Sequence, residues 1–300
     1  MALRFDAGEV VTAMVTPMKK SGEIDYNKAE ELAKYLIANG SETLLVAGTT
    51  GESPTLTHEE ELELLSTVKR ASANKAKIIM NTGSNSTETA VKMTKLAKKE
   101  EVDAVLAVVP YYNKPSQKGM IEHFSAVAEA SDLPLILYNI PSRTGVNMLP
   151  ATVAYLADKY SNIVAIKQSC SDMDLISEMK IQCPADFAIY SGDDSLTLPM
   201  MALGVHGVIS VASHLFGAEL KSMIRNFKTG EVTAAKNMHK TLFPVFRKLF
   251  MAPNPVPVKA ALSHIGLIED YVRLPLVRLD DAQKAELFAV VDKVKTELAG

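Results

Sequence analysis

Apolar and polar positions alternate along the chain in two recurring kinds of segment. Short runs rich in valine, isoleucine and leucine are followed by longer stretches whose apolar residues recur at helical spacing. In residues 27–39, for example, one face carries Ala29, Leu32, Ala33, Leu36 and Ile37. The short runs predict eight strands, at 10–16, 43–47, 77–81, 104–110, 133–139, 163–167, 187–191 and 207–211.

This alternation predicts an α/β fold and favours a (β/α)8 TIM barrel. Near-continuous apolar strands are what a parallel sheet covered by helices requires. An open, doubly wound sheet is the alternative that the same alternation allows. We expect residues 1–229 to form the catalytic barrel and residues 230–300 a helical region packed on it, with a proline-rich break at 253–257.

Residues typical of helix ends support these boundaries. Thr57 precedes an acidic turn with Glu60 three positions on, which predicts a capping box. Ser86 is expected to begin the following helix, and Gly40 to end the first one in a left-handed conformation.

Composition and charge narrow the choice of partners. The net charge of −3 provides no general attraction for nucleic acid, and the absence of tryptophan limits the surface for base stacking, so no nucleic-acid partner is expected. No segment approaches 18 uninterrupted apolar residues, so no membrane partner is expected. Cys170 and Cys183 have neither metal-site nor disulfide spacing, and residues 1–8 lack the apolar core of a signal peptide. These features predict a cytoplasmic protein.

Lys167, at the end of the sixth predicted strand, is the first candidate for chemistry. Barrel enzymes act at the C-terminal ends of their strands. A lysine there is partly removed from water, and its neutral amine can attack a ketone to form an imine. A solvated lysine at a strand end is the alternative interpretation of this position.

Three hydroxyl-bearing residues, Thr49, Tyr112 and Tyr138, follow or end other predicted strands. Imine chemistry must move protons onto a carbinolamine and off a methyl carbon. A phenol is a poor base alone, but it can relay protons when it is hydrogen-bonded to other hydroxyls. Ordinary packing of tyrosines and strand threonines is the alternative interpretation.

Two further features suit an anionic ligand. The loop Gly48-Thr49-Thr50-Gly51-Glu52 has exposed backbone N–H groups and hydroxyls that suit a phosphate or a carboxylate. Phosphate sites in barrels usually follow the last two strands, whereas this loop follows the second. Arg143, just beyond the fifth strand, suits bidentate binding of a carboxylate, with a surface ion pair as the alternative.

Four motifs in this order resemble the dihydrodipicolinate synthase / N-acetylneuraminate lyase family, from residue 10 to about residue 279. They are the Gly48–Glu52 loop, Pro110-Tyr111-Tyr112-Asn113-Lys114-Pro115, Tyr138-Asn139-Ile140-Pro141 and the strand that ends in Lys167. Within the family, Ser142-Arg143-Thr144-Gly145 is similar to the synthase branch.

The resemblance implies a mechanism that depends on covalent substrate binding. Lys167 would form an imine with pyruvate, so that no metal or organic cofactor is needed. Tyr138 would transfer protons near the imine, and Thr49 and Tyr112 would complete the relay. Tyr112 would come from the neighbouring subunit of a tight dimer, which makes the expected state a dimer or a tetramer.

The resemblance also implies how both substrates are bound. Arg143 would hold the carboxylate of L-aspartate 4-semialdehyde, and Thr50 the carboxylate of pyruvate. Gly192 and Ile209 would shape the site. The expected reaction is the condensation of the two substrates on the diaminopimelate and lysine pathway.

The sequence departs from the family at two places. After the lysine the family commonly has Glu and, three residues on, Gly, where this chain has Gln168 to Ser171. Members inhibited by lysine have an effector pocket with a glutamate that is replaced here by Thr89, which predicts weak or absent inhibition. Other positions of that pocket match in Ser53, His58, Asn85 and Tyr111.

Two other functions fit the same residues. One is cleavage of a sialic acid or a 2-keto-3-deoxy sugar acid, for which Arg143 has less use than it has for a semialdehyde carboxylate. The other is a non-catalytic ligand sensor, which would tolerate the loss of Lys167 or a tyrosine.

Overall fold

The structure, a computed structural model, describes residues 2–299. Eight parallel strands follow one another in chain order and close into a barrel, so the predicted fold is confirmed and the open-sheet alternative is wrong. The strands are β1 (Val10–Ala13), β2 (Thr43–Val46), β3 (Lys77–Asn81), β4 (Ala104–Val108), β5 (Leu135–Asn139), β6 (Ile163–Gln168), β7 (Ala188–Ser191) and β8 (Gly207–Ser210).

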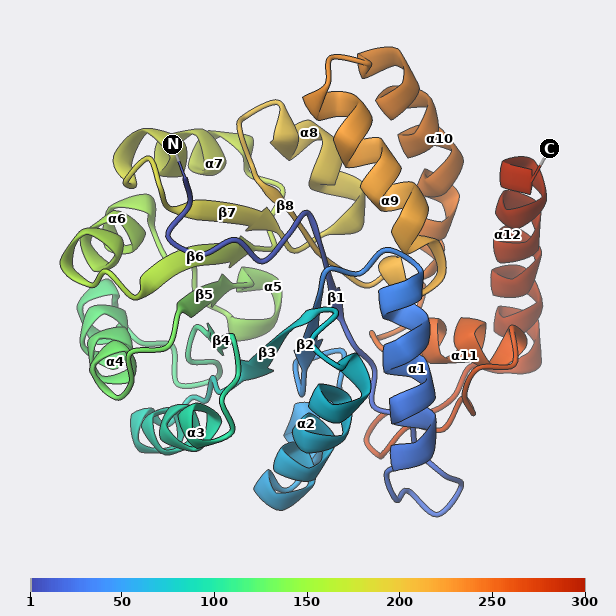
Figure 1. Cartoon of the computed structure of the whole chain (residues 1–300), viewed down its shortest axis with the longest axis horizontal. Coiled ribbons are helices and arrows are strands. Elements are labelled where there is room, and N and C mark those ends of the chain that lie inside the picture. The colour runs from blue at the N-terminus through green and yellow to red at the C-terminus, as the bar shows by residue number, and fades with distance from the viewer. Residues whose placement is uncertain (1, 300) are drawn as a thin grey trace. The chain divides into compact units, whose positions relative to one another are not determined.

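Helices alternate with the strands, as the colour sequence of Figure 1 shows. The α-helices are α1 (Tyr26–Ala38), α2 (His58–Ser72), α3 (Thr87–Lys99), α4 (Gln117–Glu129), α5 (Pro141–Thr144), α6 (Pro150–Lys159), α7 (Met173–Gln182), α8 (Thr197–Met201), α9 (Ser213–Lys228), α10 (Val232–Lys248), α11 (Val256–His264) and α12 (Asp281–Ala299). Two short 3-10 turns, η1 (Ser53–Thr55) and η2 (Asp194–Leu196), follow β2 and β7.

The chain divides into two compact units. The first comprises Ile78–Ile209 with residues 2–8, and it contains the parallel ladders from β3 to β8. Its strands are buried on both faces, as in β5 and β6, where every residue is buried. This explains why they appear in the sequence as continuous apolar runs.

The second unit comprises Glu9–Lys77 and residues 210–299. It contains the β1–β2 ladder and the helices that follow β8. Within it, α10 contacts α9 and α12, and α12 also contacts α11. The expected helical region after the barrel is therefore present. No helix in the described part of the chain is long and apolar enough to cross a membrane.

The predicted helix ends are confirmed in detail. Thr57 and Glu60 form a reciprocal capping box at the start of α2, and the Ser86 hydroxyl accepts a hydrogen bond at the start of α3. Gly40 follows α1 with a φ of 101°, and a Cβ there would lie 3.0 Å from the backbone of Ala218. Glycine is therefore required at this turn both for its backbone conformation and for its lack of a side chain.

The first strand is shorter than predicted. It was expected to run to residue 16, but β1 ends at Ala13. The reason is that the N–H of Val15 donates to the imidazole of His214, at 3.1 Å, rather than to a neighbouring strand. A buried histidine therefore ends this strand's ladder, which apolar patterning does not reveal.

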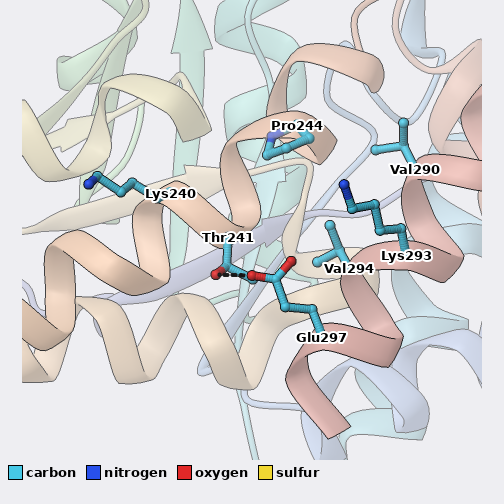
Figure 2. Close-up of a pocket in the computed structure, with 7 residues that line it drawn as sticks. All are labelled: Lys240, Thr241, Pro244, Val290, Lys293, Val294 and Glu297. Carbon is cyan, nitrogen blue, oxygen red and sulfur yellow. Dashed lines mark hydrogen bonds between the residues drawn. The ribbon is translucent and has the colours of Figure 1, made fainter. Parts of the chain in front are cut away.

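A cavity of about 250 Å³ lies between α10 and α12 in the second unit (Figure 2). A hydrogen bond from Thr241 to Glu297 at 3.1 Å joins the two helices beside this cavity. The residues that line it are Lys240, Thr241, Pro244, Val290, Lys293, Val294 and Glu297. None of the site residues predicted from the sequence lines this cavity.

Candidate active site

Lys167 and Tyr138 lie side by side at the C-terminal ends of β6 and β5. They are paired in the parallel ladder, and Lys167 Nζ lies 4.4 Å from the centroid of the Tyr138 ring. Lys167 is 6% exposed and makes no ion pair with any described residue, so it is not a solvated lysine at a strand end. An unpaired buried amine beside a phenol is the combination that imine chemistry needs.

Gly192 packs directly against this lysine. A Cβ at position 192 would lie 2.9 Å from Lys167 Cε and would collide with the hydroxyl of Ser169. Any larger residue would therefore displace the lysine side chain. The structure thus brings Lys167, Tyr138 and Gly192 together, as expected from the sequence.

A hydrogen-bonded network lies immediately behind the lysine. The Asn139 amide donates to Asn147 at 2.7 Å and to Gln168 at 3.1 Å, and its oxygen accepts from the N–H of Met148. Gln168 in turn donates to Cys170 Sγ at 2.9 Å. The network ties the ends of β5 and β6 together with neutral groups, at the position where the family commonly has a glutamate.

Arg143 and Tyr112 are both exposed, in contrast to the lysine. Arg143 lies in the short helix α5, and its guanidinium makes no ion pair with the described residues. Tyr112 is 89% exposed and has a φ of 73°. Since a left-handed backbone costs a residue with a side chain roughly 1–3 kcal/mol, such conformations often mark functional positions.

Ile209, expected to shape the site, is a fully buried residue of β8. Its side chain is part of the apolar interior, and no polar role follows from its position.

The Gly48–Glu52 loop belongs to the second unit, where it follows β2. Thr49 is half-buried, whereas Thr50 is buried and its hydroxyl accepts a hydrogen bond from Asn254 at 2.9 Å. A hydroxyl that accepts from asparagine keeps its own proton free to donate to an anion. The carbonyl of Gly51 accepts from Thr16 at 2.6 Å, which holds the loop against the end of β1.

Glu52 anchors the same loop through a buried ion pair that sequence analysis missed. Its carboxylate accepts from Lys259 at 2.6 Å and from the N–H of Arg273 at 3.0 Å. The two paired side chains are 1% and 0% exposed. Burial lowers the pKa of Lys259, and the attraction of Glu52 opposes that shift.

His214 is hydrogen-bonded to Val15, in the segment that follows β1. It is fully buried, and burial lowers its pKa to about 4. Its Nε2 accepts from Val15 and its Nδ1 lies 2.8 Å from the carbonyl of Val211. These partners require the neutral tautomer with the proton on Nδ1.

Comparison with known proteins identifies the family. The model of the Dihydrodipicolinate synthetase family matches residues 6–294. The chain belongs to this family. Two similar curated relatives are 4-hydroxy-tetrahydrodipicolinate synthases. That of Thermosynechococcus vestitus is 52% identical, covering 96% of this chain and 97% of its own. That of Desulforamulus reducens is 51% identical, covering 91% and 92%.

Solved structures of the family have the same fold. A synthase from Cyanidioschyzon merolae with lysine bound superposes with a TM-score of 0.95 at 45% identity, covering 96% of this chain and 98% of its own. A chloride-inhibited synthase from Acinetobacter baumannii in complex with pyruvate gives 0.94 at 36% identity, covering 97% and 99%. Family membership therefore applies to the whole length of the barrel and its helical extension.

Proposed function

We propose that this protein condenses pyruvate with L-aspartate 4-semialdehyde, the reaction of a 4-hydroxy-tetrahydrodipicolinate synthase. The observation that carries the proposal is the buried, unpaired amine of Lys167 over the ring of Tyr138. Relatives with about half of their residues in common have this activity. The reaction supplies the diaminopimelate and lysine pathway, and we place it in the cytoplasm.

The first half of the reaction takes place on Lys167. Its neutral amine attacks C2 of pyruvate, and the carbinolamine loses water to give an iminium. The positive nitrogen acidifies the methyl group, so that loss of a proton from C3 gives an enamine. Tyr138, whose ring centroid lies 4.4 Å from the lysine nitrogen, carries these protons, with Thr49 and Tyr112 as the further members of the relay.

The second half forms the carbon–carbon bond. The enamine C3 attacks the aldehyde carbon, the aldehyde oxygen takes up a proton, and water releases the product from Lys167. Because the lysine nitrogen is the electron sink, no metal or organic cofactor is required. Thr50, whose hydroxyl accepts from Asn254, donates its own proton to the pyruvate carboxylate, while Gly192 and Ile209 shape the site.

Arg143 binds the carboxylate of the semialdehyde in this proposal. A guanidinium that is exposed and unpaired among the described residues is available for such a ligand. We expect Arg143→Ala to raise KM for the semialdehyde about 10- to 100-fold while pyruvate still binds. An unchanged KM, or better turnover of a polyhydroxylated aldehyde than of the semialdehyde, would favour a sugar-acid lyase instead.

Tyr112 acts in the site of a neighbouring subunit, so the active protein is at least a dimer and its dimers can pair into tetramers. Its exposure and left-handed backbone support a role outside its own subunit. Mixing Lys167→Ala with Tyr112→Phe restores one complete site in each mixed dimer. In an equimolar mixture of twofold-symmetric dimers about half of the dimers are mixed, and one of the two sites in each of these is complete. The mixture should therefore recover about a quarter of wild-type activity. No recovery after verified subunit exchange would contradict this role.

A further inference from the structure

The mechanism proposed above assigns no role to Ser169, which lies two residues beyond Lys167 in the sequence. Its hydroxyl oxygen is fully buried, although the residue as a whole is half-buried. It has no hydrogen-bond partner among the described residues. A buried hydroxyl without a partner costs about 1–3 kcal/mol, so such groups call for a functional explanation.

Strand geometry directs this hydroxyl toward the same side as the lysine. Side chains two positions apart on a strand point to one face. The strand pairing continues one residue past the end of β6. The N–H of Ser169 donates to the backbone carbonyl of Asn139 at 2.9 Å, and the N–H of Gly192 donates to the backbone carbonyl of Gln168 at 2.8 Å. Ser169 therefore lies on the same face of the strand as Lys167, two residues nearer its C-terminal end.

Gly192 shows how close the two groups are. A Cβ on Gly192 would meet the Ser169 hydroxyl oxygen first and Lys167 Cε next, at 2.9 Å. The Ser169 hydroxyl and the Lys167 side chain therefore both pack against Gly192.

We propose that Ser169 is a further catalytic residue, which donates a hydrogen bond to the aldehyde oxygen of the second substrate. This inference rests on the proposed function, in which Thr50 already binds the pyruvate carboxylate. Within that assignment, the aldehyde oxygen is the polar atom of the reacting groups that still lacks a hydrogen-bond donor. It is also the atom on which negative charge develops.

The bond changes of this step balance without any additional reagent. The enamine C3 forms a bond to the aldehyde carbon, and the electron pair of the aldehyde π bond moves to oxygen. The enamine nitrogen returns to an iminium, and the relay that includes Tyr138 supplies the proton that converts the alkoxide to an alcohol. Ser169 stabilises the oxygen during this change and keeps its own proton.

Ser169→Ala separates the two half-reactions. Exchange of the pyruvate methyl protons with solvent deuterium requires the imine and enamine but no aldehyde. We expect Ser169→Ala to exchange at the wild-type rate, while kcat/KM for the semialdehyde falls about 10- to 100-fold. Its unfolding free energy should be unchanged or higher, because the lost hydroxyl has no partner in the folded chain.

Ser177→Ala is the matched control, because its hydroxyl lies on α7 and donates to Met173 at 2.9 Å. This control should leave both rates unchanged. If Ser169→Ala slows exchange as much as condensation, or slows neither, the proposed role of Ser169 is wrong while imine catalysis stands. If wild-type protein itself exchanges no pyruvate protons, the proposed function fails first.

Discussion

Replacing Lys259 with methionine should destabilise the protein through the carboxylate that remains. Glu52 would keep one backbone donor, the N–H of Arg273 at 3.0 Å, and would lose the ammonium at 2.6 Å. Both side chains are almost completely buried, so the carboxylate cannot turn to solvent. Removing one partner of a buried ion pair costs about 3–5 kcal/mol, which is a large part of a typical folding free energy.

The double variant Glu52→Gln/Lys259→Met identifies the cause of this loss. With both charges gone, the desolvation penalty disappears, and we expect the double variant to unfold at higher denaturant than Lys259→Met alone. Urea unfolding followed by circular dichroism, at one protein concentration, gives the comparison. Lys95→Met, at an exposed position of α3, is a suitable control for the loss of a lysine outside this pair.

The result that would refute this reasoning is a loss below about 1 kcal/mol for Lys259→Met. That outcome would mean that Glu52 escapes burial or finds another donor. Simple additivity of the two single variants would likewise contradict a coupled pair. Because Glu52 ends the loop that carries Thr49 and Thr50, we also expect Lys259→Met to lose activity at a lower urea concentration than the one at which it unfolds.

Three further predictions concern pH, inhibition and the space beside the lysine. The unfolded chain protonates His214 near pH 6.5 and the folded chain only at about 4, so the unfolded state binds more protons between them. The free energy of unfolding should therefore fall as pH decreases from 6.5 to 4, by about 3 kcal/mol from this group. In His214→Gln the free energy of unfolding should depend less on pH over this range. An equal pH dependence in wild type and variant would contradict the prediction. Free lysine should inhibit weakly or not at all in a steady-state titration, because Thr89 offers no carboxylate to an ammonium; strong inhibition at low concentration would overturn this. Gly192→Ala should abolish covalent trapping of pyruvate in a folded protein, because its Cβ takes the space of Lys167; normal trapping would show that the lysine can move.

The barrel was predictable because its strands are buried on both faces. Burial of this kind leaves continuous apolar runs in the sequence, and all eight predicted strands are present with ends that differ by a few residues. Capping residues such as Thr57 act within one turn of the chain, so local sequence was sufficient to predict them. The end of β1 depends on His214, which is distant in sequence, and it was predicted wrongly.

The candidate site was predictable only in part. Lys167 and Tyr138 end neighbouring strands, so parallel pairing brings them together whenever the strands are predicted correctly. The Glu52–Lys259 pair joins residues 207 positions apart. Neither residue has a local pattern that reveals its partner. The position of the buried Ser169 hydroxyl requires that residue 192 has no side chain, which only the folded arrangement shows.

Covalent trapping of pyruvate tests imine formation on Lys167 most directly. The protein is incubated with pyruvate, reduced with borohydride and digested, and the modified peptide is mapped by mass spectrometry, with Lys167→Arg as the control. We expect a reduced pyruvyl adduct on Lys167 and none in the control. A folded wild-type protein without an adduct at Lys167 would contradict the imine mechanism and favour a ligand sensor built on the same barrel.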